Sequence, residues 1–211
     1  MSNMQTALLE PVKSITVVDR PDTLSAFLKP HCAAAIWRRQ PPADFQSWLN
    51  ALDPTCLPQG RIVLRREAVR STVHRLCETS RTPAAAWRDE LVSDITALAE
   101  VFAKMMQTSH LRLRLQVVTS NACRKFHVDA ITARLVCTYR GTGTQYGFSN
   151  LGKDPTRVFT VPTGVPLLLR GSKWPEKPAS GLLHRSPPIE GTGETRLVLV
   201  LDPVRERDIA E

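Results

Sequence analysis

The chain has 211 residues, five cysteines and a formal net charge of +8, with a pI of about 9.7. This length suits one domain, or one domain with a helical annex, and it can bury a core without disulfide support. No apolar run approaches the roughly 20 residues of a membrane-spanning helix, and the N-terminus lacks the pattern of a secretory signal. The odd number of cysteines, without a Cys-x-x-Cys pair, favours free thiols in a cytoplasmic protein.

Residues 1–109 have the pattern of a helical region. Apolar side chains recur at helical spacing in four stretches of this part of the chain. They predict helices over residues 23–28, 43–52, 63–77 and 87–106. We expect this N-terminal region to pack on the outside of whatever the remaining residues form.

Residues 110–211 have the pattern of a β-rich domain. Leu111, Leu113 and Leu115 alternate with Arg112 and Arg114, which predicts a strand with one apolar and one polar face. Glycine and proline turns separate the short strands that follow. These strands are predicted over residues 132–140, 157–161, 165–169, 181–183 and 196–201. The chain as a whole is therefore predicted to be α+β, with a barrel or sandwich in its second part.

Two short motifs predict a metal site. In the sequence Phe126-His-Val-Asp129, residues His127 and Asp129 point to the same side if the chain is extended. The second motif contains a histidine, His184, followed by Arg-Ser-Pro-Pro, and it lies 57 residues after His127. Two imidazoles and one carboxylate form the facial triad of non-heme iron sites, which leaves metal positions open for a co-substrate and dioxygen. The sequence predicts one divalent ion between His127, Asp129 and His184.

Cysteine ligands are an alternative at this site. Cys123 and Cys137 flank the His-x-Asp element, and Cys137 shares strand parity with Asp129. A thiolate ligand would turn the site towards zinc, which favours sulfur and nitrogen donors. Alternatively, each cysteine is a small core residue and does not bind the metal.

The order of these features resembles that of the Fe(II)/2-oxoglutarate-dependent dioxygenases. A His-x-Asp element, a glycine-rich turn, Pro162-Thr-Gly164 before an apolar strand, His184, and Arg196 at the start of the last strand follow one another. The resemblance covers about residues 111–202 and implies a double-stranded β-helix, a jelly-roll or cupin-like barrel, with the N-terminal helices packed outside. It implies Fe(II) and 2-oxoglutarate as cofactors, with zinc as the other candidate metal. Arg196 would then bind the distal carboxylate of 2-oxoglutarate, since a planar guanidinium binds a carboxylate through two hydrogen bonds.

Two further residues are candidates for binding the co-substrate. Arg185 directly follows His184 and could compete with Arg196 for the acidic co-substrate. The Asn-x-Tyr element that some relatives use for the other carboxylate is not evident. Tyr139 could replace it, because Tyr139 shares strand parity with Asp129 if the strand is unbroken.

Structural roles are the alternatives for the same groups. His127 could be a buried histidine that is hydrogen-bonded to Asp129 without any metal. Arg196 could form an ion pair with Asp202 or Glu194.

The chain also resembles an uncharacterised bacterial family of unknown function. The residues that carry this likeness are 126–129, 138–144, 184–188 and 196–202, and it runs over most of the chain. Members of that family are associated with zinc-homeostasis genes, which implies a metal-linked role.

Three functions follow from these patterns. The first is an Fe(II)/2-oxoglutarate-dependent oxygenase, and the second is a non-catalytic zinc- or metal-binding protein in metal homeostasis. The third is a basic module that binds nucleic acid through the arginines of residues 61–75, whose spacing is that of a solvated helix face. The spread of arginines along the whole chain disfavours this third function.

Overall fold

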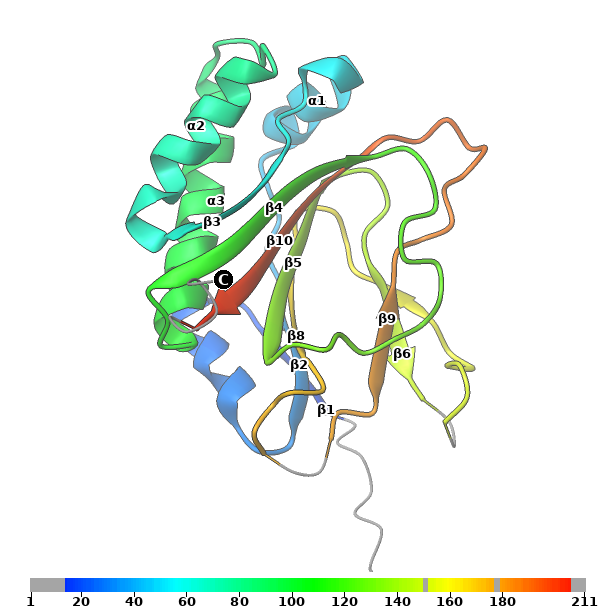
Figure 1. Cartoon of the computed structure of the whole chain (residues 1–211). Coiled ribbons are helices and arrows are strands. Elements are labelled where there is room, and N and C mark those ends of the chain that lie inside the picture. Colours follow the sequence, from blue (N-terminus) through cyan, green and yellow to red (C-terminus); the bar gives the residue numbers. More distant parts are fainter. Residues whose placement is uncertain (1–13, 150–151, 177–178, 206–211) are drawn as a thin grey trace, which may run out of the picture.

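Two β-sheets face each other in the computed structural model, which describes residues 14–149, 152–176 and 179–205 (Figure 1). The larger sheet has the order β1 (Ser14–Val18), β2 (Cys32–Trp37), β8 (Pro166–Arg170), β5 (Ala133–Arg140), β10 (Arg196–Val204), β4 (His110–Val118) and β3 (Gly60–Arg65). The smaller sheet has the order β7 (Phe159–Thr160), β6 (Gln145–Phe148) and β9 (Leu182–Arg185). All paired strands are antiparallel except β1 and β2.

Helices cover the outer face of the larger sheet. The α-helices are α1 (Ala43–Ala51), α2 (Val69–Thr79) and α3 (Ala86–Met105), and the 3-10 helices are Pro21–Leu28, Pro54–Cys56 and Arg66–Ala68. In α3 the apolar side chains at helical spacing, among them Leu91, Ile95, Leu98 and Phe102, are buried against the sheet. Within the described residues, no helix is both long and apolar enough to cross a membrane.

Strand alternation divides the interior into two clusters. On β4, the side chains of Leu111, Leu113 and Leu115 pack under the helices. On β10, Val198 and Val200 point the other way and pack with side chains of both sheets. Successive side chains of a strand lie on opposite faces. The face of the larger sheet that carries Val198 and Val200 therefore borders the space between the sheets, and we call it the inner face.

The N-terminal region differs from the expected helical one. It contributes β1, β2 and β3 to the same sheet as the C-terminal strands, so strands from both sides of the expected boundary after residue 109 share one sheet. The expected helix over residues 63–77 is wrong in its first part, because Gly60–Arg65 pairs with β4 and α2 begins only at Val69. The arginines of residues 61–75 are thus split between a strand and a helix and form no single helix face.

The β-rich part forms two facing sheets. Strands lie close to the predicted positions, and β6 is one that the sequence patterns did not predict. Among the described residues, no backbone pairing joins the two sheets, so the arrangement is an open pair of sheets without barrel closure.

Candidate metal centre

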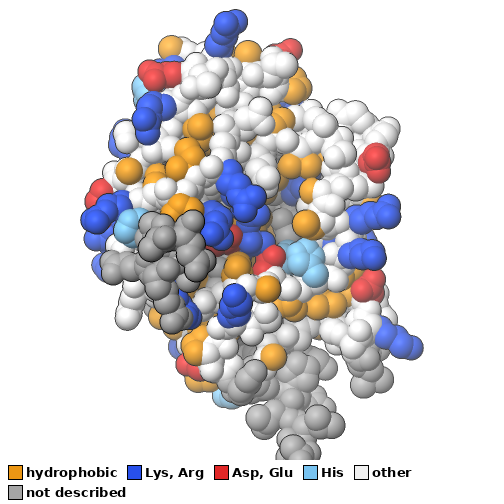
Figure 2. Space-filling view, viewed as in Figure 1, with side chains coloured by type: hydrophobic (Ala, Val, Ile, Leu, Met, Phe, Trp, Pro, Cys, Tyr) orange, Lys and Arg blue, Asp and Glu red, His pale blue; other side chains and the backbone are white. Residues whose placement is uncertain are grey.

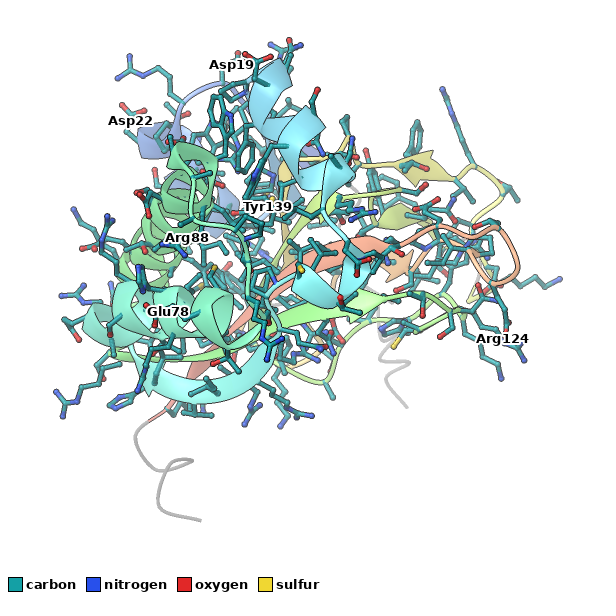
Figure 3. The ribbon with its side chains drawn as sticks, turned by 90° about the horizontal axis from the view of Figure 1, so that it is seen from above. Asp19, Asp22, Glu78, Arg88, Arg124 and Tyr139 are labelled. Atoms are coloured by element: carbon teal, nitrogen blue, oxygen red, sulfur yellow. The ribbon has the colours of Figure 1, made fainter. Side chains whose placement is uncertain are left out.

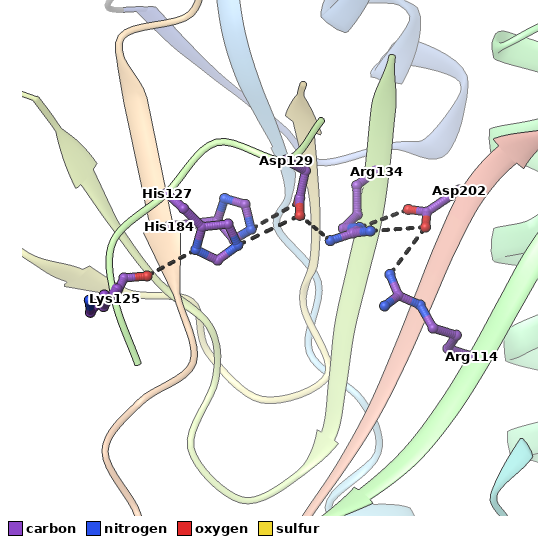
Figure 4. Close-up of polar contacts among 7 residues, drawn as sticks. All are labelled: Arg114, Lys125, His127, Asp129, Arg134, His184 and Asp202. Atoms are coloured by element: carbon purple, nitrogen blue, oxygen red, sulfur yellow. Dashed lines mark hydrogen bonds and ion pairs between the residues drawn. The ribbon is translucent and has the colours of Figure 1, made fainter. Parts of the chain in front are cut away.

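His127 and His184 are brought together by backbone pairing. His184 lies on β9, and the segment that contains His127 runs antiparallel beside it. His127 N–H donates to His184 O at 3.1 Å, and His184 N–H donates to His127 O at 3.0 Å. Residues that exchange both hydrogen bonds lie directly opposite each other. The two imidazole rings therefore lie side by side, with centroids 4.5 Å apart (Figure 4).

Asp129 is held by the turn that follows β8. Ser172 N–H donates to Asp129 O at 2.8 Å, and Gly171 N–H donates to Thr132 O at 2.9 Å. A Cβ atom on Gly171 would lie 1.9 Å from the backbone oxygen of Ile131. Glycine at this position lets the two backbones approach closely, and this approach places the Asp129 carboxylate beside the histidines.

The three side chains converge on one point. Asp129 Oδ1 lies 3.6 Å from His127 Nε2, and Asp129 Oδ2 lies 3.1 Å from His184 Nε2. One ligand atom from each of the three residues lies within 4.8 Å of the others. Nitrogen and oxygen donors about 2.0–2.2 Å from one ion lie roughly 3–4.4 Å apart, so both carboxylate–imidazole distances fall in that range.

The protonation of the three side chains suits a cation. His127 Nδ1 lies 2.9 Å from the carbonyl oxygen of Lys125. A carbonyl can only accept, so Nδ1 donates to it and Nε2 is the ring nitrogen that faces Asp129. Burial lowers the pKa of His184 and outweighs the opposite effect of Asp129, which favours a neutral imidazole. For Asp129, burial raises the pKa, but His184, Arg134 and His127 together lower it to about 2, so the carboxylate is ionised.

One buried oxygen of this cluster has no donor. Asp129 Oδ2 lacks a hydrogen-bond partner among the described residues, although the neutral imidazole of His184 lies close to it. A buried polar atom without a partner costs free energy, and a cation placed between the carboxylate and the imidazoles would remove that cost. The donor set, two imidazoles and one carboxylate, is that of a facial triad. The residues therefore fit a divalent metal ion.

Arg134 fixes the Asp129 carboxylate from the other side. Arg134 forms an ion pair with Asp129, with Nη1 2.5 Å from Oδ1, and donates to both oxygens of Asp202, at 2.7 and 2.9 Å. Arg114 also donates to Asp202, at 3.1 Å (Figure 4). The motif analysis missed this role of Arg114 and Arg134, and the signal for it was the polar face of the alternating strands β4 and β5. Partners of this kind orient metal ligands and tune their basicity.

Arg196 borders the same cavity as the two histidines. This cavity has a volume of about 100 Å³ and lies between the sheets. Arg196 is only 1% exposed, and it donates to Thr142 O at 2.6 Å and to Thr138 Oγ1 at 3.3 Å. Burial lowers its pKa to about 10, against the opposing effect of Glu194.

The two carboxylates considered for Arg196 have other partners. Asp202 pairs with Arg114 and Arg134, and Glu194 accepts hydrogen bonds from Thr142. Among the described residues, Arg196 forms no ion pair with a carboxylate. A buried cation without an anionic partner is costly, so an anion in this cavity would be favoured.

Tyr139 lies on the opposite face of the sheet from the metal centre. Its hydroxyl donates to Asp94 of α3 at 2.6 Å, and its ring lies between the sheet and the helices (Figure 3). The prediction that Tyr139 lies on the same strand face as Asp129 is wrong, because residues 129–132 do not form a strand. The alternation of side chains that begins at Ala133 is therefore independent of Asp129. Tyr139 is therefore not placed to bind a co-substrate in the cavity.

The cysteines and Arg185 also lie apart from the ligand atoms. Cys137 shares the helix-facing side with Tyr139, so its expected position beside Asp129 is wrong. Cys123 borders the cavity and is exposed, but its sulfur is not among the atoms that converge. Arg185 borders the cavity too, yet its guanidinium stacks on Phe126 and donates to Gln145 at 2.9 Å. It is thus engaged elsewhere and does not compete with Arg196.

Solved structures of dioxygenases are similar to this chain. One is the 2-oxoglutarate complex of dioxygenase for auxin oxidation 1 from Arabidopsis thaliana, at 10% sequence identity and a TM-score of 0.53, covering 90% of this chain and 92% of that one. Another is the dioxygenase for auxin oxidation in rice, at 13% identity and a TM-score of 0.53, covering 92% of this chain and 84% of that one. At this identity the likeness shows a shared fold. No curated protein matches the chain in sequence.

A family model described as "Protein of unknown function (DUF1826)" matches residues 18–202. Because the match spans most of the chain, the chain belongs to that family. The resemblance to a family of unknown function is thus confirmed, whereas its bacterial occurrence and its link with zinc-homeostasis genes stay predictions.

Proposed function

We propose that this protein is an Fe(II)/2-oxoglutarate-dependent oxygenase built on a double-stranded β-helix. His127, Asp129 and His184 hold the metal ion, and Arg196 binds the distal carboxylate of 2-oxoglutarate. The shared fold with dioxygenases supports this proposal. The convergence of two imidazoles and an ionised carboxylate supports it from the chain's own residues.

The single observation that carries the proposal is the position of Arg196. A buried guanidinium without a carboxylate partner borders the cavity that contains both histidines. Metal binding alone does not require such a cation, and the positive charge of Arg196 would repel a metal ion. An acidic co-substrate, which binds the metal at one end and the arginine at the other, accounts for both features.

Arg134, Val136 and Val198 have supporting roles in this reaction. When bound, the iron couples the oxidation of 2-oxoglutarate to succinate and carbon dioxide with the insertion of one oxygen atom of dioxygen into a substrate C–H bond. Arg134 keeps the Asp129 carboxylate oriented towards the metal position. Val136 and Val198 line the cavity with apolar surface, which limits the access of water.

Anaerobic absorption spectroscopy tests the proposal. Fe(II) and 2-oxoglutarate, added to the full-length protein without oxygen, should give a weak visible charge-transfer band. Arg196→Lys keeps the charge but loses the planar fork, so half-saturation of the band should need about 10-fold more 2-oxoglutarate, equivalent to about 1.4 kcal/mol.

Arg185→Lys is the matched control, because Arg185 borders the same cavity while its guanidinium is engaged by Gln145 and Phe126. This variant should titrate as the unmodified protein does. Absence of the band, together with one equivalent of zinc that resists exchange with iron, would contradict an oxygenase and favour metal handling.

A further inference from the structure

Arginines gather on the inner face of the larger sheet beside the metal centre. Arg61 of β3 lies directly opposite Arg114 of β4, and Arg112 is two residues from Arg114 on the same face. Arg134 of β5 joins them through the carboxylate of Asp202. In the space-filling view, Lys and Arg side chains lie next to a histidine cluster on this face (Figure 2).

This arrangement has an excess of positive charge. Like charges directly opposite on neighbouring strands are destabilising. Asp202 already accepts three hydrogen bonds from Arg114 and Arg134, and Asp129 belongs to the metal centre. Arg114 Nε is buried and has no hydrogen-bond partner among the described residues. Burial, together with the charges of Arg134 and Arg61, lowers the pKa of Arg114, as expected for a cation that lacks sufficient anionic partners.

Different members of this group of arginines border two separate hollows. Arg114 and Arg134 border the cavity that contains the histidines. A larger hollow of about 770 Å³ is lined by Arg112, Lys173 and residues 130–132, which directly follow Asp129. A molecule in the larger hollow would therefore contact Arg112 and Lys173, next to the segment that follows Asp129.

We infer that the substrate of this oxygenase carries an anionic group, a phosphate or a carboxylate, which Arg61, Arg112 and Arg114 bind while the reacting C–H bond lies at the metal centre. This inference rests on the proposed function. Guanidinium groups bind both kinds of anion through paired hydrogen bonds. An anion at Arg114 would offset the excess positive charge around this side chain and relieve the repulsion from Arg61.

Thermal unfolding of the full-length protein, saturated with Zn(II) and 2-oxoglutarate, tests this inference. Phenyl phosphate and phenylacetate are the two probes, and the one that raises the melting midpoint more identifies the anion class. A ligand that binds only the folded state stabilises it in proportion to its affinity. Arg61→Gln should weaken the binding of the preferred probe at least about fivefold. The same variant should raise the midpoint without a probe, because it removes one of two opposed like charges.

Arg70→Gln is the matched control, with the same change of charge at an exposed position of α2. It should leave the affinity for the probe unchanged. Equal affinities of the unmodified protein and the Arg61→Gln variant, an equal loss in Arg70→Gln, or competition between the probe and 2-oxoglutarate would overturn the inference. The charge-transfer band tests the oxygenase itself, so a failure of one proposal can be told from a failure of the other.

Discussion

The Asp129 carboxylate lies between two imidazoles on one side and the Arg134 guanidinium on the other. Arg134 withdraws some electron density from Oδ1, but it also prevents the carboxylate from rotating away. Partners of this kind typically change metal affinity about 10–100-fold when they are removed. Orientation of the ligand is therefore the main contribution that we assign to Arg134.

Arg134→Gln should lower the affinity for Co(II), a spectroscopic substitute for iron, by about 10–100-fold. The measurement is a titration of the Co(II) absorption bands. Arg112→Gln serves as the control, since Arg112 lies on the same sheet face and forms no ion pair with Asp129. Similar affinities in the two variants would show that Arg134 has no such role.

The raised pKa values of the buried thiols predict which cysteines react with an alkylating reagent. Burial raises the pKa of Cys137 to about 12 and that of Cys77 to about 11. At pH 8 both thiols are then almost entirely protonated, and the thiolate is the reactive form. Iodoacetamide at pH 8 should modify the exposed Cys123 and leave Cys137 and Cys77 intact, as measured by mass spectrometry of the native protein. Rapid labelling of Cys137, or its protection only when metal is added, would return it to the list of possible ligands.

Several site residues could be predicted from the sequence, and others could not. The triad residues were identifiable because a His-x-Asp element, a glycine-rich turn, a distal histidine and an arginine follow one another in the order found in the dioxygenases. Arg134 carries no motif, and only the pairing of β5 with β10 places it beside Asp202. Tyr139 was misplaced because parity cannot be followed through the irregular residues 129–132.

At the scale of elements, α3 is tied to the sheet by a polar cluster. Asp94 of α3 accepts the Tyr139 hydroxyl hydrogen bond and two hydrogen bonds from Arg39. Burial and the charge of Asp94 raise the pKa of Tyr139 well above its usual value, so the phenol stays protonated and donates. This cluster stabilises the packing of the helix on the face opposite the metal centre.

Tyr139→Phe should lower the free energy of unfolding by about 1–3 kcal/mol, because the partly buried Asp94 carboxylate loses one donor. It should leave the dissociation constant of 2-oxoglutarate unchanged. Urea unfolding and the anaerobic titration measure the two quantities. A variant of unchanged stability that binds 2-oxoglutarate weakly would place Tyr139 at the co-substrate after all.

The turn after β8 positions the ligand loop. Gly171→Ala should weaken Co(II) binding at least about 10-fold, because its Cβ would collide with Ile131 O and displace Asp129. Gly191→Ala is the control: it introduces strain at a positive φ, but its Cβ would meet open space. Equal Co(II) affinities in the two variants would show that the close backbone approach does not position Asp129.

Strands were easier to predict in the C-terminal half of the chain than in the N-terminal half. The alternation of leucine and arginine in β4 identifies a strand whose two faces differ. β2 is buried on both faces and reads Cys-Ala-Ala-Ala-Ile-Trp, so it shows no alternation. β3 runs directly into the 3-10 helix and α2, and its apolar residues merge with the helical pattern that follows.

At the scale of the whole molecule, one sheet unites both halves of the chain. β3 pairs with β4 and forms one edge of the larger sheet, whereas β2 pairs with β8 and joins the other edge strand, β1, to the sheet. Local patterns could not reveal these long-range pairings, because they report which residues form a strand and not which strand is its neighbour. The helices then cover the outer face, and the inner face remains for the metal centre.

The most direct test of this account is anomalous diffraction from crystals grown with Mn(II) and 2-oxoglutarate. We predict one strong peak about 2.0–2.3 Å from His127 Nε2, His184 Nε2 and an oxygen of Asp129, with the co-substrate reaching from the metal to Arg196. A peak at any other cluster of residues, or an empty triad at saturating Mn(II), would contradict the assignment of the metal centre.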